Sequence, residues 1–179
     1  MAFLNLASLP TATFESAYKL NEDVRLYSQP GAPKYHVFIS YRHEDRSYVP
    51  RVAKFLKGLQ AGIYIDFLDE ELAKAPDSQT APILRRRITQ CSKLIQIITP
   101  NSSDSRWMPW ELGLGDGILG YRNAVTLPII NTYQPKVSQD YLDMYGHIET
   151  TTARNSTYED WSIQYPDNTA EWFTTWLKK

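Results

Sequence analysis

The sequence contains a single cysteine, Cys91, so no disulfide can form within the chain. Small secreted domains usually depend on disulfides, whereas a lone cysteine is typical of proteins from a reducing compartment. The first residues, MAFLNLASLPTATF, have no basic start, and Asn5, Ser8 and Pro10 interrupt their apolar residues. This pattern is unlike a secretory signal. We therefore expect a cytoplasmic protein.

Excess charge and long apolar runs are also missing. The chain has 19 Lys and Arg against 20 Asp and Glu, which gives a net charge of −1. A nucleic-acid-binding protein usually has a clear basic surplus. No segment approaches the roughly 20 consecutive apolar residues of a membrane-spanning helix. Because hydrophobic residues still make up 42% of the 179 residues, we expect one packed domain with no nucleic-acid partner and no membrane segment.

Motifs of several common enzyme classes are absent. No G-x-G-x-x-G follows the first predicted strand, which argues against a conventional Rossmann dehydrogenase. None of the histidines has a serine or cysteine spaced as a nucleophile pair. The acidic residues between Asp66 and Glu71 lack the spacing of a ligand loop. We therefore expect no bound metal.

Proline and glycine mark a boundary near the start of the chain. The segment QPGAP, residues 29–33, contains two prolines and a glycine, which are typical of a linker or turn. We predict an N-terminal extension over residues 1–33 that stays outside the sheet and packs along the domain or a neighbouring subunit. The main domain is expected over residues 34–179.

Strand-like and helix-like segments alternate after this boundary. Four short runs rich in Val, Ile and Leu have the character of buried strands: 35–41, 63–67, 93–99 and 124–130. Three predicted helices lie between them: 47–59, 80–91 and 105–119. This alternation predicts a flavodoxin-like, doubly wound parallel α/β sheet of four or five strands, with helices on both faces. A further helix is predicted over 168–178, whereas 131–166 match no pattern.

Glu111 lies where such a sheet is expected to bind its ligand. Doubly wound sheets bind ligands beyond the carboxyl ends of their strands, at the point where strand order reverses. In the common 2-1-3-4-5 order, that point is between the strands 35–41 and 93–99. Glu111 follows the second of these strands, in the sequence SRWMPWELGLGDG.

A purely structural role for Glu111 is also open. If Pro109 is the first helical residue and Met108 the cap, Glu111 is the third, where glutamate commonly caps the backbone. The helix N-terminus would then keep the carboxylate ionised at neutral pH. Sequence spacing alone does not separate this role from a catalytic one.

Four blocks of sequence, taken in order, resemble bacterial Toll/interleukin-1 receptor (TIR) domains. They are VFISYRHED, IYIDF with its acidic loop, ILRRRITQCSKLIQIITPNS and SRWMPWELGLGDG, and together they span about residues 34–130. Trp107 and Glu111 form the pattern W-x-x-x-E, in which glutamate is the catalytic residue of NAD-cleaving TIR domains. The resemblance implies that Glu111 is catalytic and that NAD is a substrate rather than a cofactor. The loop ELAKAPDSQTAP departs from the family, because many TIR domains have a glycine there.

The resemblance also implies a wider substrate site. Its substrate-binding residues would be Ser40, Tyr41, Arg42, Asp66, Ser105, Trp107 and Trp110. Of these, Arg42 could pair with a diphosphate, and the two tryptophans could form aromatic walls or anchor their helix in the core. One carboxylate can suffice for this chemistry, because the nicotinamide leaving group already carries a positive charge, whereas ordinary glycosides need two carboxylates.

Finally, the resemblance implies a biological setting. The chain holds little beyond the TIR-like segment, as does the signal-producing component of Thoeris-type antiphage defence. That component converts NAD into an ADP-ribose-derived, often cyclic, messenger for a separate effector protein. TIR relatives also commonly act as homo-oligomers, and the loop 66–79 is the contact we expect here. The alternatives are a non-catalytic TIR scaffold and a hydrolase that only depletes NAD.

Overall fold

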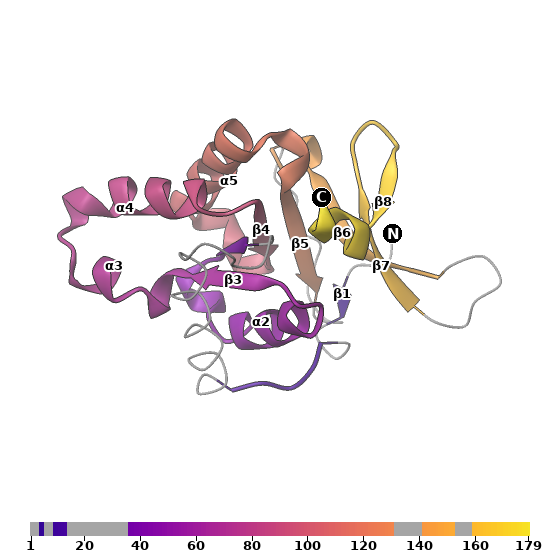
Figure 1. Cartoon of the computed structure of the whole chain (residues 1–179), viewed down its shortest axis with the longest axis horizontal. Helices are drawn as coiled ribbons and strands as arrows, with labels where there is room; N and C mark the ends of the chain where they lie inside the picture. The colour runs from indigo at the N-terminus through magenta and orange to yellow at the C-terminus, as the bar shows by residue number, and fades with distance from the viewer. Residues whose placement is uncertain (1–3, 6–8, 14–35, 131–140, 153–158) are drawn as a thin grey trace.

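The computed structural model describes residues 4–5, 9–13, 36–130, 141–152 and 159–179, and Figure 1 shows their arrangement. Within these ranges the chain forms one eight-stranded sheet. Its strands are β1 (Leu4–Asn5), β2 (His36–Ser40), β3 (Gly62–Ile65), β4 (Lys93–Ile98), β5 (Ala124–Ile130), β6 (Gly146–Thr152), β7 (Glu159–Gln164) and β8 (Ala170–Trp172).

The strand order confirms the predicted fold class. The main path runs β3-β2-β4-β5-β6-β7-β8, and neighbours from β3 to β6 pair in parallel. Those five strands have the 2-1-3-4-5 order of a flavodoxin-like sheet. The predicted adjacency of the first and third strands is correct, since Ser40 of β2 is the register partner of Gln96 of β4.

The prediction of four or five strands was too low. β7 and β8 extend the sheet with antiparallel pairing. β6 has the sequence GHIETTT and β7 has EDWSIQ, so neither contains the continuous apolar run that identifies a strand buried on both faces. Antiparallel strands at the end of a sheet need only one apolar side, which leaves a much weaker sequence signal.

The N-terminal segment also contributes to the sheet. β1 pairs in parallel with the end of β5, where Leu4 is the partner of Ile129. The expectation that residues 1–33 stay outside the sheet is therefore wrong for this strand. Leu9 lies buried in the core, and Arg51 donates a hydrogen bond to its carbonyl oxygen at 2.7 Å. Residues 9–13 thus pack along the domain as expected, while the QPGAP boundary falls outside the described residues.

Five α-helices connect or follow the strands in the described ranges. They are α2 (Val49–Gly58), α3 (Glu70–Lys74), α4 (Asp77–Thr89), α5 (Trp107–Leu119) and α6 (Phe173–Lys178). The predicted C-terminal helix is shorter than expected, because Ala170–Trp172 instead pair with β7 as strand β8. Trp172, at the end of this strand, is 42% exposed.

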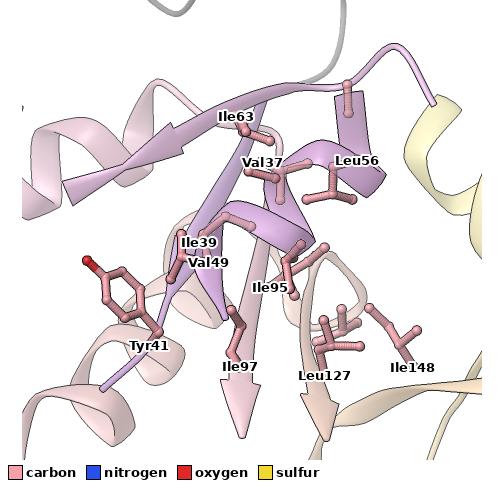
Figure 2. Close-up of a cluster of buried hydrophobic side chains, with 14 of the residues drawn as sticks. Val37, Ile39, Tyr41, Val49, Leu56, Ile63, Ile95, Ile97, Leu127 and Ile148 are labelled. Carbon is pink, nitrogen blue, oxygen red and sulfur yellow. The ribbon is translucent and has the colours of Figure 1, made fainter. Parts of the chain in front are cut away.

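Alternate residues of the central strands point into two different apolar layers. Val37 and Ile39 pack in one cluster with α2 and α6, and the labelled side chains of this layer are drawn in Figure 2. Phe38 and Leu94 belong to a second cluster that includes residues of α4 and α5. Figure 1 shows α5 and α2 on opposite sides of the strands. The helices therefore cover both faces of the sheet, as predicted.

Among the helices in the described part of the chain, none has both the length and the apolar character to cross a bilayer.

Candidate active site

The candidate site is formed where β2, β3 and β4 end and α5 begins. Ser40 is the last residue of β2, and Asp66 directly follows β3 in the short 3-10 helix η3 (Asp66–Leu68). After β4, the 3-10 helix η4 (Pro100–Asp104) leads the chain to α5. The parallel order of the three strands brings their carboxyl ends to one edge, so residues distant in sequence meet there.

Glu111 lies deeper in its helix than the sequence predicted. α5 begins at Trp107 with Arg106 as its N-cap, so Pro109 is the third helical residue and Glu111 the fifth. The proposed Met108 cap and third-position glutamate are therefore wrong. The Oε2 atom of Glu111 instead accepts a hydrogen bond of 2.5 Å from the Ser40 hydroxyl on β2. The carboxylate is thus directed at the edge of the sheet.

Burial controls the protonation of Glu111. The side chain is only 7% exposed, and this burial raises its pKa to about 8. The hydrogen bond from Ser40 lowers the pKa, and the negative charge of Asp66 raises it, but both effects are smaller. The expectation of an ionised carboxylate at neutral pH is therefore not met in the unliganded protein. A helix N-terminus exerts most of its effect within the first helical turn, and Glu111 lies beyond that turn.

Asp66 and Tyr41 form a second polar pair at the same edge. The Tyr41 hydroxyl donates a hydrogen bond to Oδ1 of Asp66, which also accepts one of 2.7 Å from the Phe67 amide. Burial raises the pKa of Asp66, although these hydrogen bonds oppose the rise. Burial and the neighbouring carboxylate both raise the pKa of Tyr41, so it remains a neutral donor. Figure 2 shows its hydroxyl directed away from the apolar cluster.

Two further residues join the loops that follow β2 and β4. Asp45 is fully buried and accepts hydrogen bonds from Thr99 Oγ1 at 2.5 Å and from Asn101 Nδ2 at 2.8 Å. Arg42 donates to the carboxylate of Glu44 and to the carbonyl oxygen of Asn101. Arg42 therefore already has partners, and a diphosphate would have to compete with Glu44 for its guanidinium group.

The two tryptophans of α5 have different environments. Trp107 is 50% exposed, whereas Trp110 packs against the apolar cluster beneath α5. Their rings meet edge to face with centroids 5.5 Å apart. Trp110 thus anchors its helix in the core, which is one of the two roles expected for these tryptophans. Ser105 accepts a hydrogen bond of 3.3 Å from the Met108 amide, which places it in contact with the first turn of α5.

The structure brings Ser40, Tyr41, Asp66 and Glu111 together, with Arg42 at the rim. Their roles in substrate binding and catalysis remain predictions. In the described part of the chain, no group of three or more His, Cys, Asp or Glu side chains is arranged to hold a metal ion.

Sequence reasoning missed Gln96, which is fully buried in β4. Its Nε2 atom donates to Ser40 Oγ at 3.1 Å and to the carbonyl oxygen of Met108 at 2.6 Å. An amide within the otherwise apolar run LIQII was the available signal, because buried polar groups in strands usually serve a hydrogen-bond network.

Comparison with known proteins identifies the family of the chain. Residues 37–163 match the family model described as "TIR domain". Over 169 residues, the chain is 31% identical to "Probable 3' cyclic ADP-D-ribose synthase ThsB'" of Bacillus cereus (strain MSX-D12), covering 92% of this chain and 82% of the relative.

A second relative, from Cytobacillus dafuensis, is provisionally named cyclic ADP-D-ribose synthase TIR2. It is 33% identical over 84 residues, which cover 44% of this chain and 21% of the relative. The family match spans most of the sheet and the whole candidate site, and the first relative aligns over nearly the whole chain. The chain therefore belongs to the TIR domain family.

Proposed function

We propose that this protein cleaves the bond between nicotinamide and ribose in NAD and converts the remaining ADP-ribose into a cyclic signal for antiphage defence. The observation that carries the proposal is the buried Glu111 carboxylate, held by Ser40 at the carboxyl-end edge of the sheet. The names of the two relatives as cyclic ADP-D-ribose synthases support the same reaction.

The first step requires a negative charge more than an acid. When the C–N bond breaks, its electron pair goes to the nicotinamide nitrogen, and nicotinamide leaves as a neutral molecule. Positive charge develops on the ribose ring, as in other glycosyl transfers. An ionised Glu111 would stabilise this charge, and the effect is strong in a site from which water is excluded.

The raised pKa of Glu111 fits a carboxylate that ionises when its ligand binds. In the unliganded protein the group is largely protonated at pH 7, since its pKa is about 8. A nearby cation favours the ionised form of a carboxylate. The positive nicotinamide ring of NAD would therefore lower the pKa of Glu111 on binding and release its proton to solvent.

The second step decides the product. A hydroxyl oxygen attacks the ribose carbon, forms a new C–O bond and loses its proton, which the Glu111 carboxylate can accept. If the hydroxyl belongs to the same ADP-ribose molecule, the product is cyclic; if it belongs to water, the product is linear. The relatives' names favour cyclisation, and exclusion of water by the exposed ring of Trp107 would favour it further.

Other parts of the proposal concern binding and assembly. Trp107 would stack on a ring of NAD, because an aromatic face attracts a cationic ring, and Arg42 would bind the diphosphate. The protein would act as a homo-oligomer with the loop 66–79 at the contact. Its product would activate a separate effector protein.

Product analysis tests the proposed function. The protein is incubated with NAD, alone and with extract from phage-infected cells, and products are separated by chromatography and identified by mass spectrometry. We expect nicotinamide and a product lighter than linear ADP-ribose by one water. Linear ADP-ribose alone would identify a hydrolase. If nicotinamide release never exceeds that of Glu111→Gln, the protein is not an NAD-cleaving enzyme.

A further inference from the structure

Gln96 is a polar residue in a position where packing favours an apolar one. It lies in the middle of β4 with an exposed fraction of 0%, between the buried residues Ile95 and Ile97. Its Oε1 atom is buried and has no hydrogen-bond partner in the described part of the chain. An unpaired buried carbonyl oxygen destabilises the folded state. Stability of the core therefore gives no reason for an amide here.

The orientation of this amide is determined by its neighbours. The oxygen and nitrogen of a glutamine side chain are hard to distinguish by shape alone. The carbonyl oxygen of Met108 can only accept, however, so the Gln96 atom 2.6 Å from it must be the nitrogen. The second hydrogen of that nitrogen is directed at Ser40 Oγ, 3.1 Å away.

This arrangement fixes the direction of the Ser40 hydroxyl. A serine oxygen can accept from one group while its own hydrogen is donated to another. Ser40 accepts from Gln96, and its hydrogen is directed at Glu111 Oε2, 2.5 Å away. Ser40 and Gln96 are register partners on adjacent strands, so the geometry between them is set by the sheet itself.

We infer that Gln96 is a positioning residue of the active site, which orients the Ser40 hydroxyl toward Glu111 and ties the first turn of α5 to β4 through Met108. The inference rests on the proposed role of Glu111 in NAD cleavage. Groups that are already oriented need not reorganise when charge develops on the substrate. Loss of Gln96 should therefore slow the chemical step more than it weakens substrate binding.

The decisive variant is Gln96→Met, which keeps a similar length but removes both donors. We expect kcat for nicotinamide release to fall about 10- to 100-fold, the range seen when a residue that orients a metal ligand is removed, with KM nearly unchanged. Gln96→Leu serves the same purpose if the methionine variant folds poorly. In combination with Ser40→Ala, the loss should not be additive, because Gln96 acts through Ser40. Fully additive losses would overturn the inference.

A matched control and a readout independent of turnover complete the test. Thr126 is the register partner of Gln96 on β5 and is also buried, but its hydroxyl is directed at the Gly146 carbonyl oxygen. Thr126→Val should leave kcat unchanged.

Carboxyl NMR titration, assigned with Glu111→Gln, should show a higher pKa for Glu111 in Gln96→Met than in wild type. This titration tests the positioning role of Gln96 even if wild-type protein does not cleave NAD. Failure of that role can therefore be distinguished from failure of the proposed NAD cleavage. An unchanged Glu111 titration overturns the inference. Where wild type turns over NAD, an unchanged kcat in Gln96→Met also overturns it.

Discussion

At the edge where the parallel strands begin, ionic side chains are paired with opposite charges or aromatic rings. Lys93, at the start of β4, donates to Asn123 and lies 4.9 Å from the centre of the Trp176 ring. Glu171 accepts hydrogen bonds from Lys179 and Tyr165. Burial alone would raise the pKa of Glu171, but these hydrogen bonds and the positive charges of Lys179 and Lys93 together lower it.

At the opposite edge, where the strands end, three carboxylates of the candidate site and its loops are held by neutral groups. Glu111 accepts from Ser40, Asp66 from Tyr41, and the buried Asp45 from a threonine hydroxyl and an asparagine amide. The pKa values of Glu111 and Asp66 are raised as a result of burial. One edge thus holds its ionic side chains in charged or aromatic pairs, and the other holds Glu111 and Asp66 through neutral donors, with raised pKa values. Five predictions test this difference.

The largest expected effect is on catalysis at the carboxyl-end edge. Glu111→Gln keeps the size of the side chain and a hydrogen-bond acceptor for Ser40 but removes the charge. We expect kcat for nicotinamide release to fall about 100- to 1000-fold, the typical result of losing one preorganised electrostatic group. Folding raises the pKa of Glu111 well above 4.5, so burying this group already costs stability at pH 7, and the melting temperature of the variant there should equal or exceed that of wild type. A variant with wild-type turnover would show that Glu111 has only a structural role.

A substitution in the core at the amino-end edge should lower stability and leave kcat unchanged. Trp176 is 1% exposed, and its indole N–H donates to the Arg122 carbonyl oxygen at 2.6 Å. Trp176→Ala should lower the free energy of unfolding by about 3–5 kcal/mol, measured by denaturant titration. Trp176→Phe keeps most of the packing and should cost clearly less. For either variant, kcat per folded molecule should stay at the wild-type value; a large loss of kcat would contradict the separation of the two edges.

The stability of the protein should depend on pH through Glu111. The pKa of Glu111 is raised from 4.5 to about 8 on folding, so between these values the folded state binds more protons than the unfolded chain. Its contribution to stability is therefore full below about pH 4.5 and is lost as pH rises through 8, with a total on the order of a few kcal/mol. Glu111→Gln should remove this part of the pH dependence, so the variant should be the more stable protein above pH 8.

Activity should respond to the same group with the opposite sign. If ionised Glu111 is the active form, kcat/KM should rise with pH, reach half its maximum near pH 8 and level off only above that pH, because this ratio reports the free enzyme. Stability and activity would then change in opposite directions over one pH range. An activity profile that is flat between pH 6 and about 8 would contradict the assignment.

The sequence predicted the elements that position the site better than it predicted contacts within the site. Continuous apolar runs identified β2, β3, β4 and β5, and the parallel order then placed Glu111 at the correct edge. The start of α5 was misplaced by two residues, because Pro109 is acceptable anywhere in a first helical turn. The expected protonation of Glu111 was wrong for a different reason: burial raises its pKa, and helix position alone does not predict burial. Gln96 was missed, since the pattern of a buried strand says nothing about which atoms its side chains reach across the sheet.

The smallest expected effect compares one ion-paired arginine from each edge. Arg42 pairs with Glu44 near the candidate site, and Arg122 pairs with Asp167 at the far edge, at 2.6 Å. Ion pairs at the surface contribute little to stability, so Arg42→Ala and Arg122→Ala should both melt close to wild type.

The two variants should differ in substrate binding. If Arg42 exchanges Glu44 for the diphosphate of NAD, Arg42→Ala should raise KM about 3- to 10-fold, the effect of losing one charge-assisted hydrogen bond to a solvated ligand. Arg122→Ala should leave KM unchanged, because Arg122 lies at the edge where the strands begin. Initial-rate measurements over a range of NAD concentrations make the comparison. Equal KM values for the two variants would mean that Arg42 serves only its contacts with Glu44 and Asn101, and that it does not bind the diphosphate.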